Sequence, residues 1–275
     1  MFTLNCNGRL VVIDKPVVMG IINATPDSFY QNSRMAAIDT ALQSAEKMLA
    51  DGAFFFDIGG QSTAPGSTLI SAEEEADRLL PLIEAIYKTF PHSFISIDTF
   101  YADVAKQAVA SGACLINDIS GGMIDENMLS TAASLSVPYV LMHIKGTPQT
   151  MQQYAVYEDV TKEVLDYFIQ KIDDCKQAGI HDVIIDPGFG FAKTINQNFT
   201  LLNNLDIFKM LQKPILAGIS RKGTIYKTLG ITPDKALNGT TVLNTIALLK
   251  GANILRVHDV KEAVEAIELV GKTMV

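Results

Sequence analysis

The sequence lacks the features that mark disulfide-rich, secreted and membrane-spanning proteins. It has only three cysteines, which form no Cys-x-x-Cys pair and have no histidine at a metal-ligand spacing: Cys6, Cys114 and Cys175. Such sparse cysteines give neither a disulfide framework nor a zinc pattern, and they are typical of a reducing cytoplasm. Apolar runs are interrupted within about ten residues, too short for a spanning helix. With no basic region and apolar stretch at its start, we expect no signal peptide and a soluble, cytoplasmic protein.

The sequence also has no excess of basic residues. Lys and Arg number 22 against 30 Asp and Glu, so the formal net charge is −8. This balance disfavours broad binding to nucleic acid or to an anionic membrane, and we expect neither partner. A small anionic ligand stays possible, because a local cluster of Arg, Lys and helix N-termini can oppose the overall charge.

Eight short apolar runs recur along the chain, separated by segments with helical spacing. Each run is nearly continuous rather than alternating, as is typical of parallel strands that are covered on both faces. The predicted strands are residues 17–23, 54–60, 94–99, 114–120, 138–143, 182–188, 214–220 and 253–259. Eight strands alternating with helices favour an α/β fold, a (β/α)8 TIM barrel, over an open doubly wound sheet, which periodicity alone leaves possible. We expect one such domain over residues 1–275.

Helices and a hairpin complete the predicted fold. Helices are expected over residues 35–51, 71–90, 101–111 and 157–178. Ser71, with Glu74 three residues later, predicts a capping box at the second of these helices. Before the first strand, Asn7-Gly8 between two short apolar runs predicts a short N-terminal β-hairpin. We expect this hairpin to plug the bottom of the barrel.

Polar residues end every predicted strand. They are Asn23, Asp57, Asp98, Asn117 with Asp118, His143, Asp186, Ser220 with Arg221 and Lys222, and Arg256 with His258. Turns and helix caps explain any one of them, but they poorly explain eight in a row that include an Arg, a Lys and two His. Because these strand ends converge on one face of a barrel, they predict a polar pocket of mixed charge.

One part of this pocket suits a flat heterocycle. Asp98, Asn117 and Asp186 follow apolar residues and should be partly desolvated, so their oxygens need hydrogen-bond donors. A ring with adjacent N–H and amino groups offers them, and an amide such as Asn117 can donate and accept at once. The edge of a purine-like or pterin-like ring fits this pattern.

The other part suits an anion. Lys222, Arg256 and His258 come from the last two predicted strands, where barrels commonly hold phosphate. Two polar loops that contain proline, residues 25–29 and 61–67, follow the first two strands and are expected to close over this face.

At these positions the sequence resembles the dihydropteroate synthases, a pterin-binding TIM-barrel family. The motifs that carry the resemblance follow in order over residues 19–29, 57–66, 97–99, 116–118, 186–191, 220–222 and 256–259. One motif is weak evidence, but the ordered set is highly specific. The resemblance implies a transferase of folate biosynthesis and a sulfonamide target. It would condense 6-hydroxymethyl-7,8-dihydropterin pyrophosphate with p-aminobenzoate to give 7,8-dihydropteroate and pyrophosphate, and it would form a homodimer.

The resemblance also implies individual roles. The pterin pocket would be formed by Asp98, Asn117, Met142, Asp186, Phe191, Gly218, Lys222 and Arg256. The pyrophosphate would be surrounded by Asn23, Thr63, Arg256 and His258. Asn23 would also bind Mg²⁺, the implied cofactor, and Ser220 would lie near the carboxylate of the aminobenzoate. The residues expected to stabilise the transition state are Asp98, Asp186, Lys222 and Arg256.

The implied reaction needs no nucleophile–base pair. Pyrophosphate would leave with its charge spread over Mg²⁺ and cationic groups, and the amine would attack mainly through positioning. We therefore expect His258 to contact the anion rather than act as a general base. For His143 we expect packing or a contact behind the site.

The second loop departs from the family pattern. The family commonly has Glu-Ser-Thr-Arg-Pro-Gly, whereas this chain has Gln61-Ser62-Thr63-Ala64-Pro65-Gly66. Gln61 keeps hydrogen-bonding capacity without charge. Ala64 removes a guanidinium, which predicts binding of the second substrate weaker by about 1.5–3 kcal/mol unless another residue supplies the charge.

Two other functions stay open. A corrinoid-dependent pterin methyltransferase would share the barrel and its Asp/Asn/Asp cradle, but it has no use for the anion-binding motifs at residues 220–222 and 256–258. A catalytically idle relative that stores or senses pterin is favoured by Ala64, whereas the intact pterin residues count against it. Mg²⁺-dependent release of pyrophosphate separates these three functions.

Overall fold

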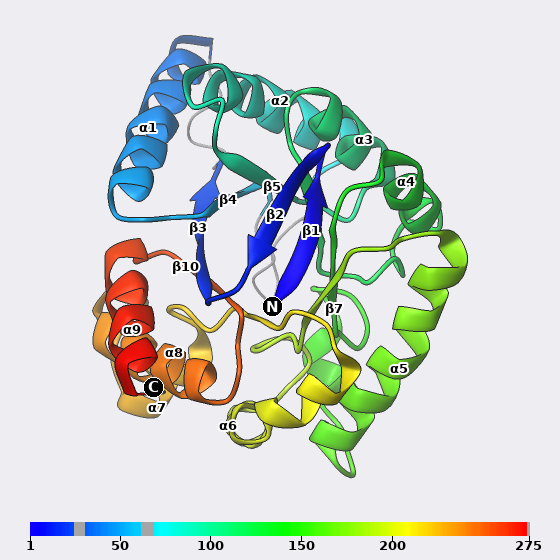
Figure 1. The fold of residues 1–275 in the computed structure, drawn as a ribbon, viewed down its shortest axis with the longest axis vertical. Helices are drawn as coiled ribbons and strands as arrows, with labels where there is room; N and C mark the ends of the chain where they lie inside the picture. Colours follow the sequence, from blue (N-terminus) through cyan, green and yellow to red (C-terminus); the bar gives the residue numbers. More distant parts are fainter. Residues whose placement is uncertain (25–30, 62–68, 274–275) are drawn as a thin grey trace.

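Eight parallel strands lie at the centre of the molecule, with the helices around them (Figure 1). The computed structural model describes residues 1–24, 31–61 and 69–273, and for residues 31–34 it describes the backbone alone. The central strands are β3 (Val17–Asn23), β4 (Phe55–Gly59), β5 (Phe94–Asp98), β6 (Leu115–Asp118), β7 (Tyr139–Met142), β8 (Val183–Asp186), β9 (Leu216–Ala217) and β10 (Ile254–Val257).

The strand order shows a barrel rather than an open doubly wound sheet. Neighbours run β8-β7-β6-β5-β4-β3-β10-β9, and every pairing among them is parallel. The two ends of this order meet at a parallel bridge between Ile185 and Ile215, so the sheet returns on itself and is nearly closed. The predicted (β/α)8 barrel is confirmed.

All eight predicted strands are present, but seven are shorter than the apolar runs. The difference is largest at β9, which spans two residues where the sequence predicted seven. After Ala217 the chain leaves the sheet and turns, with the Lys222 N–H donating to the Ile219 carbonyl over 3.2 Å and Arg221 at φ +54°. Ser220, Arg221 and Lys222 therefore lie in a loop that continues β9 rather than in the strand itself.

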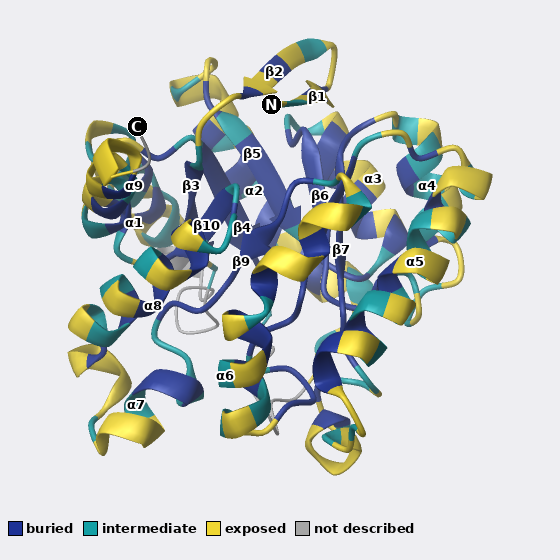
Figure 2. Cartoon of the chain, turned by 60° about the horizontal axis from the view of Figure 1, so that its bottom comes forward, coloured by how far each residue is buried: buried dark blue, intermediate teal, exposed yellow. Residues whose placement is uncertain are grey.

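Helices follow the strands around the barrel. They are α1 (Gln31–Ala50), α2 (Ala72–Thr89), α3 (Ala102–Ala110), α4 (Met128–Leu135), α5 (Val160–Ala178), α6 (Ile195–Asn203), α7 (Gly223–Leu229), α8 (Leu237–Leu249) and α9 (Val260–Thr273). Short 3₁₀ helices add η2 (Met151–Tyr154), η3 (Leu205–Leu211) and η4 (Pro233–Lys235). Their inward faces are buried and their outward faces exposed (Figure 2). In the part of the chain that is described, no helix is long and apolar enough to cross a lipid bilayer.

The capping box predicted at α2 forms only in part. The Ser71 hydroxyl accepts the Glu74 N–H at 3.1 Å, as predicted. The Glu74 carboxylate, however, pairs with Arg78 one turn later on the exposed side of the helix. A complete capping box stands instead at α6, between Thr194 and Gln197.

The predicted hairpin is confirmed and covers one end of the barrel. Its strands β1 (Phe2–Cys6) and β2 (Arg9–Ile13) pair antiparallel around Asn7-Gly8 and cross the barrel axis in Figure 1. Alternate side chains are buried, and Leu4, Val11 and Ile13 pack against the first residues of the barrel strands. Hydrophobic burial of about 1.5–3 kcal/mol for each such side chain holds the hairpin there. The opposite end of the barrel, where the strands finish, is left for a site.

Candidate active site

A cavity of about 1060 Å³ opens at the carboxyl ends of the barrel strands. Its wall contains eight of the predicted site residues: Asn23, Asp98, Phe191, Gly218, Ser220, Lys222, Arg256 and His258. The structure thus brings together side chains from β3, β5, β10 and the loops after β8 and β9. Thr63 and most of the two predicted closing loops lie outside the described residues.

Three further predicted residues are buried next to this wall. Asn117, Met142 and Asp186 are each at most 5% exposed. Asn117 donates from Nδ2 to Asp57 Oδ2 over 3.0 Å, so its amide is engaged with a neighbouring strand. Asp118, beside it, accepts the Tyr139 hydroxyl at 2.7 Å together with N–H groups of the following turn. Asp118 thereby supports the strand end rather than facing the cavity.

Arg256 is the central cation of the site. It donates from Nε to Asp57 Oδ2 and from Nη2 to Asp98 Oδ2, each over 2.5 Å. Asp57 is fully buried and also accepts the Ser96 hydroxyl at 2.5 Å. Burial alone would lower the pKa of Arg256, but Asp57 and Asp98 together raise it above its usual range. The guanidinium is therefore permanently charged and fixed between two carboxyl groups.

The two predicted pterin-binding carboxyl groups are poorly solvated. Burial raises the pKa of Asp98 to about 7, and the charge of Arg256 opposes that rise. Burial also raises the pKa of Asp186, against the effect of Lys222 and of the Gly188 N–H, which donates to Asp186 Oδ1 over 2.8 Å. Carboxyl oxygens in such surroundings gain from hydrogen-bond donors on a ligand.

Lys222 lies immediately before α7. It faces Asp186 across a space above Gly218. Its ammonium donates to the Phe189 carbonyl over 2.5 Å and lies 4.6 Å from the centre of the Phe191 ring. Burial lowers the pKa of Lys222 to about 8, although Asp186 opposes this. Gly218 leaves the space between them open, because a Cβ there would lie 3.7 Å from both Asp186 Oδ2 and Lys222 Nζ. An aromatic ring, a carboxylate and an ammonium thus border one slot.

A second lysine holds the loop after β8, and the sequence did not reveal it. Lys193 is buried and donates to the carbonyls of Gly188 and Phe191, each over 3.0 Å. Its ammonium also lies 3.0 Å from His143 Nδ1, and burial lowers the pKa of Lys193 to about 7. His143 is buried, and its pKa is well below 6.5 because of that burial and the nearby lysines. It contacts Lys193 behind the cavity, in keeping with the expected packing role.

His258 and Ser220 form a neutral pair at the cavity wall. Ser220 Oγ accepts the His258 backbone N–H at 3.2 Å and lies 3.0 Å from His258 Nδ1. Burial of the imidazole and the charge of Arg256 lower the pKa of His258 to about 4. At neutral pH, His258 would therefore reach an anion as a neutral hydrogen-bond donor rather than as a cation.

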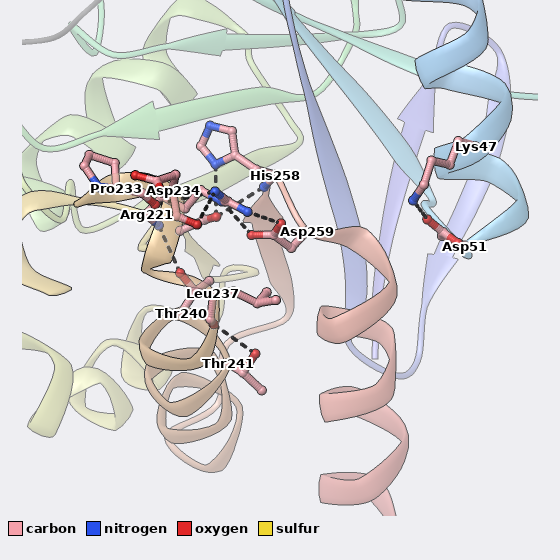
Figure 3. Close-up of polar contacts among 11 residues, drawn as sticks. Lys47, Asp51, Arg221, Pro233, Asp234, Leu237, Thr240, Thr241, His258 and Asp259 are labelled. Atoms are coloured by element: carbon pink, nitrogen blue, oxygen red, sulfur yellow. Dashed lines mark hydrogen bonds and ion pairs between the residues drawn. The ribbon is translucent and has the colours of Figure 1, made fainter. Parts of the chain in front are cut away.

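Arg221, in the same motif as Lys222, serves the scaffold. Its Nε and Nη2 donate to the two carboxylate oxygens of Asp259 over 2.9 and 2.6 Å (Figure 3). The same guanidinium donates to the Asp234 carbonyl over 3.2 Å. Arg221 lines the cavity, but this fork ties the turn after β9 to the start of α9.

A buried acid on α2 was also missed by sequence reasoning. Glu75 is fully buried and accepts the Gln61 amide at 3.0 Å and the Thr99 hydroxyl. Burial raises its pKa to about 7, against these hydrogen bonds. Helical spacing carried the signal, because Glu75 lies four residues before the buried Leu79. Glu75 holds the first residue of the second loop beside the site.

A metal site formed by the protein alone is absent from the described part of the chain. No group of three or more His, Cys, Asp or Glu side chains is placed to hold an ion there. Asn23 stands exposed at the end of β3 and lines the cavity. An amide oxygen in that position suits Mg²⁺, which commonly takes one or two protein oxygens and completes its shell with substrate phosphate and water.

Comparisons with known proteins agree with this geometry. The sequence profile of the family described as "Pterin binding enzyme" matches residues 19–258. The chain is 41% identical to the dihydropteroate synthase of Escherichia coli K12 over 273 residues, which covers 98% of this chain and 96% of that protein. It is 43% identical to the dihydropteroate synthase of Synechocystis over 247 residues, which covers 89% and 85%.

Solved structures show the same similarity. The Yersinia pestis dihydropteroate synthase in complex with a sulfonamide drug superposes with a TM-score of 0.93 at 39% identity, covering 99% of both chains. The Xanthomonas albilineans dihydropteroate synthase in complex with 7,8-dihydropteroate superposes with a TM-score of 0.88 at 35% identity, also covering 99% of both.

Proposed function

This chain belongs to the dihydropteroate synthases of the pterin-binding enzyme family, and we propose that its strand-end cavity carries out their reaction. The enzyme condenses 6-hydroxymethyl-7,8-dihydropterin pyrophosphate with p-aminobenzoate. The bond from the methylene carbon to the pyrophosphate oxygen breaks, and a bond from that carbon to the amine nitrogen forms. Pyrophosphate leaves with its electron pair, and the amine gives up a proton.

One observation carries the assignment of the ring-binding end. Asp186 and Lys222 flank the space above Gly218, and Phe191 lies against the Lys222 ammonium. We assign the pterin to this slot, with its N–H and amino donors on Asp186 and Asp98 and its ring beside Phe191. Asn117 and Met142 support it from behind. The carboxyl groups then stabilise the positive charge that develops on the electron-rich pterin as the bond from the methylene carbon to the pyrophosphate oxygen breaks.

The anionic end follows from the remaining cations. Arg256 lies between Asp57 and Asp98, and it borders the cavity with His258 and Asn23. We assign the pyrophosphate to this side, where the fixed guanidinium stabilises the leaving charge and neutral His258 donates a hydrogen bond. Arg256 thereby links the pterin and pyrophosphate ends of the substrate.

Mg²⁺ fits this arrangement as a cofactor. The Asn23 amide oxygen would be its protein ligand, together with pyrophosphate oxygens. When bound, the ion neutralises charge on the departing pyrophosphate. Thr63, predicted to contact the same group, belongs to the second loop and remains a prediction.

Self-association is the remaining part of the proposal. On α8, Val242, Ile246 and Leu249 are exposed at a spacing that places them on one face of the helix. A stripe of this kind on a helix surface is typical of an interface. We propose that it pairs with a second copy to form a homodimer, and that the enzyme works in the cytoplasm.

Joint measurement of both products tests the function. The purified protein is incubated with the pterin pyrophosphate, p-aminobenzoate and Mg²⁺, and pyrophosphate and dihydropteroate are quantified together. We expect equal amounts of both, lost on chelation of Mg²⁺ and in Asp186→Ala and Lys222→Ala, but retained in Lys106→Ala, which changes an exposed side chain on α3. A sulfonamide should compete with p-aminobenzoate. Pterin binding without either product would indicate the idle relative, and methyl transfer without pyrophosphate release would indicate the methyltransferase.

A further inference from the structure

The cavity wall contains six lysine and arginine side chains among the described residues, and five of them are committed to other groups. Arg256 pairs with Asp57 and Asp98, and Arg221 with Asp259 (Figure 3). The other committed cations donate to backbone carbonyls: Arg78 to Gly60, Lys193 to Gly188 and Phe191, and Lys222 to Phe189. These five side chains therefore already have ion-pair or hydrogen-bond partners within the protein.

Lys227 is the sixth cation, and it differs from the others. It lies on α7, about one turn after Gly223, and it is exposed at the cavity wall. Within residues 1–24, 35–61 and 69–273, its ammonium has no hydrogen bond or ion pair. Its charge is therefore available to a ligand.

Tyr226 places a second available donor beside it. The Tyr226 hydroxyl lines the same cavity and has no hydrogen-bond partner in the described part of the chain. A Cβ on Gly223 would lie 3.6 Å from both the Tyr226 hydroxyl oxygen and Lys227 Cε. The two side chains therefore approach the same point above a glycine. A hydroxyl and an ammonium that meet in this way suit one carboxylate.

We propose that Lys227 and Tyr226 bind the carboxylate of the arylamine substrate, with Lys227 supplying a positive charge that this sequence lacks at Ala64. This proposal rests on the proposed function, in which the pyrophosphate lies towards Asn23, Arg256 and His258. Asn23 and Arg256 lie in β3 and β10, and His258 directly follows β10, whereas Lys227 and Tyr226 belong to the helix after β9. The carboxylate is thus the anion available to this pair, and the pair makes the enzyme select for an acidic arylamine.

Steady-state kinetics with two matched amines tests the pair. In Lys227→Gln we expect the KM for p-aminobenzoate to rise about three- to tenfold, while kcat and the KM for the pterin pyrophosphate stay unchanged. The neutral amine p-aminobenzamide should be used equally well by the wild type and the variant. Lys227→Arg should restore most of the affinity, Tyr226→Phe should have a smaller effect in the same direction, and Lys106→Gln should have none.

Binding of an unreactive acid gives a second readout that does not depend on turnover. 4-Methylbenzoate has the carboxylate but no amine, and its affinity is measured by calorimetry with the pterin pyrophosphate and Mg²⁺ present. If Lys227→Gln binds 4-methylbenzoate more weakly but 4-methylbenzamide equally well, the result supports carboxylate binding by Lys227 and Tyr226. This holds even if the wild type makes no dihydropteroate, a result that overturns only the proposed function. If the enzyme is active and Lys227→Gln changes the KM for p-aminobenzoate and for p-aminobenzamide equally, the proposed role of Lys227 and Tyr226 is overturned, whereas the proposed function stands. A raised KM for the pterin pyrophosphate instead would place the pyrophosphate at Lys227 and also overturn it.

Discussion

Arg256 and Asp57 are joined by a 2.5 Å ion pair although 199 residues separate them in the chain. The pair reaches across β3, which lies between β10 and β4 in the sheet. Asp57 also accepts Ser96 from β5 and Asn117 from β6. One buried carboxylate thus connects four strands of the barrel and orients a guanidinium that lines the cavity.

Replacing this carboxylate by its amide should damage both stability and activity. Asp57→Asn keeps the shape of the side chain but leaves Asp98 as the one carboxylate paired with Arg256 among the described residues. We therefore expect the free energy of unfolding to fall by about 2–4 kcal/mol. Product formation should fall at least tenfold or so, because Arg256 is no longer held in place. Urea denaturation and steady-state kinetics measure the two effects, with Asp14→Asn on the exposed surface as control. A variant with wild-type stability would show that Asp57 is not an essential partner of Arg256.

The loop after β8 should not tolerate a side chain at Gly188. This residue has φ +71°, and a Cβ there would lie 2.0 Å from the His143 carbonyl oxygen. Gly230 has a similar φ of +65° but open space around it, so it is a matched control. Gly230→Ala should lower the free energy of unfolding by about 1 kcal/mol, because of backbone strain. Gly188→Ala should lower it by at least about 2 kcal/mol more, because the clash with the His143 carbonyl adds to the strain. Equal losses in thermal and urea unfolding would argue against the steric clash.

Glu75 should make stability depend on pH. Burial raises its pKa in the folded protein from 4.5 to about 7, so the folded state holds this proton more tightly than the unfolded chain. The resulting stabilisation is full below about pH 4.5 and is lost as the pH rises through 7. Relative to Glu75→Gln, the wild type should therefore lose roughly 2–3 kcal/mol between pH 4.5 and 8. Urea titrations at several pH values measure this difference, with Glu73→Gln as an exposed control. A difference that stays constant with pH would contradict the assignment.

Much of the site could be predicted because its residues have a local signature. Asn23, Asp98 and Lys222 follow apolar runs, and a barrel brings all strand ends to one face. Lys193 and Glu75 had no such signature, although each is as much a part of the arrangement. Lys193 looks like a surface lysine in sequence, and Glu75 stands out only by its helical spacing. Their burial depends on what packs over them, which comes from other segments of the chain.

The sequence by itself determined the eight strands in order, the N-terminal hairpin and the polar strand ends, because periodicity, turn chemistry and apolar runs are properties of neighbouring residues. Tertiary structure alone decided that Arg256 pairs with Asp57, that Arg221 serves the scaffold and that Lys227 has no ion pair with any residue that the structure describes. It also decided that the pKa of His258 is lowered to about 4, because the imidazole is buried beside the charge of Arg256. Partners and protonation depend on distances through space and on exclusion of water, and both arise only when the barrel closes.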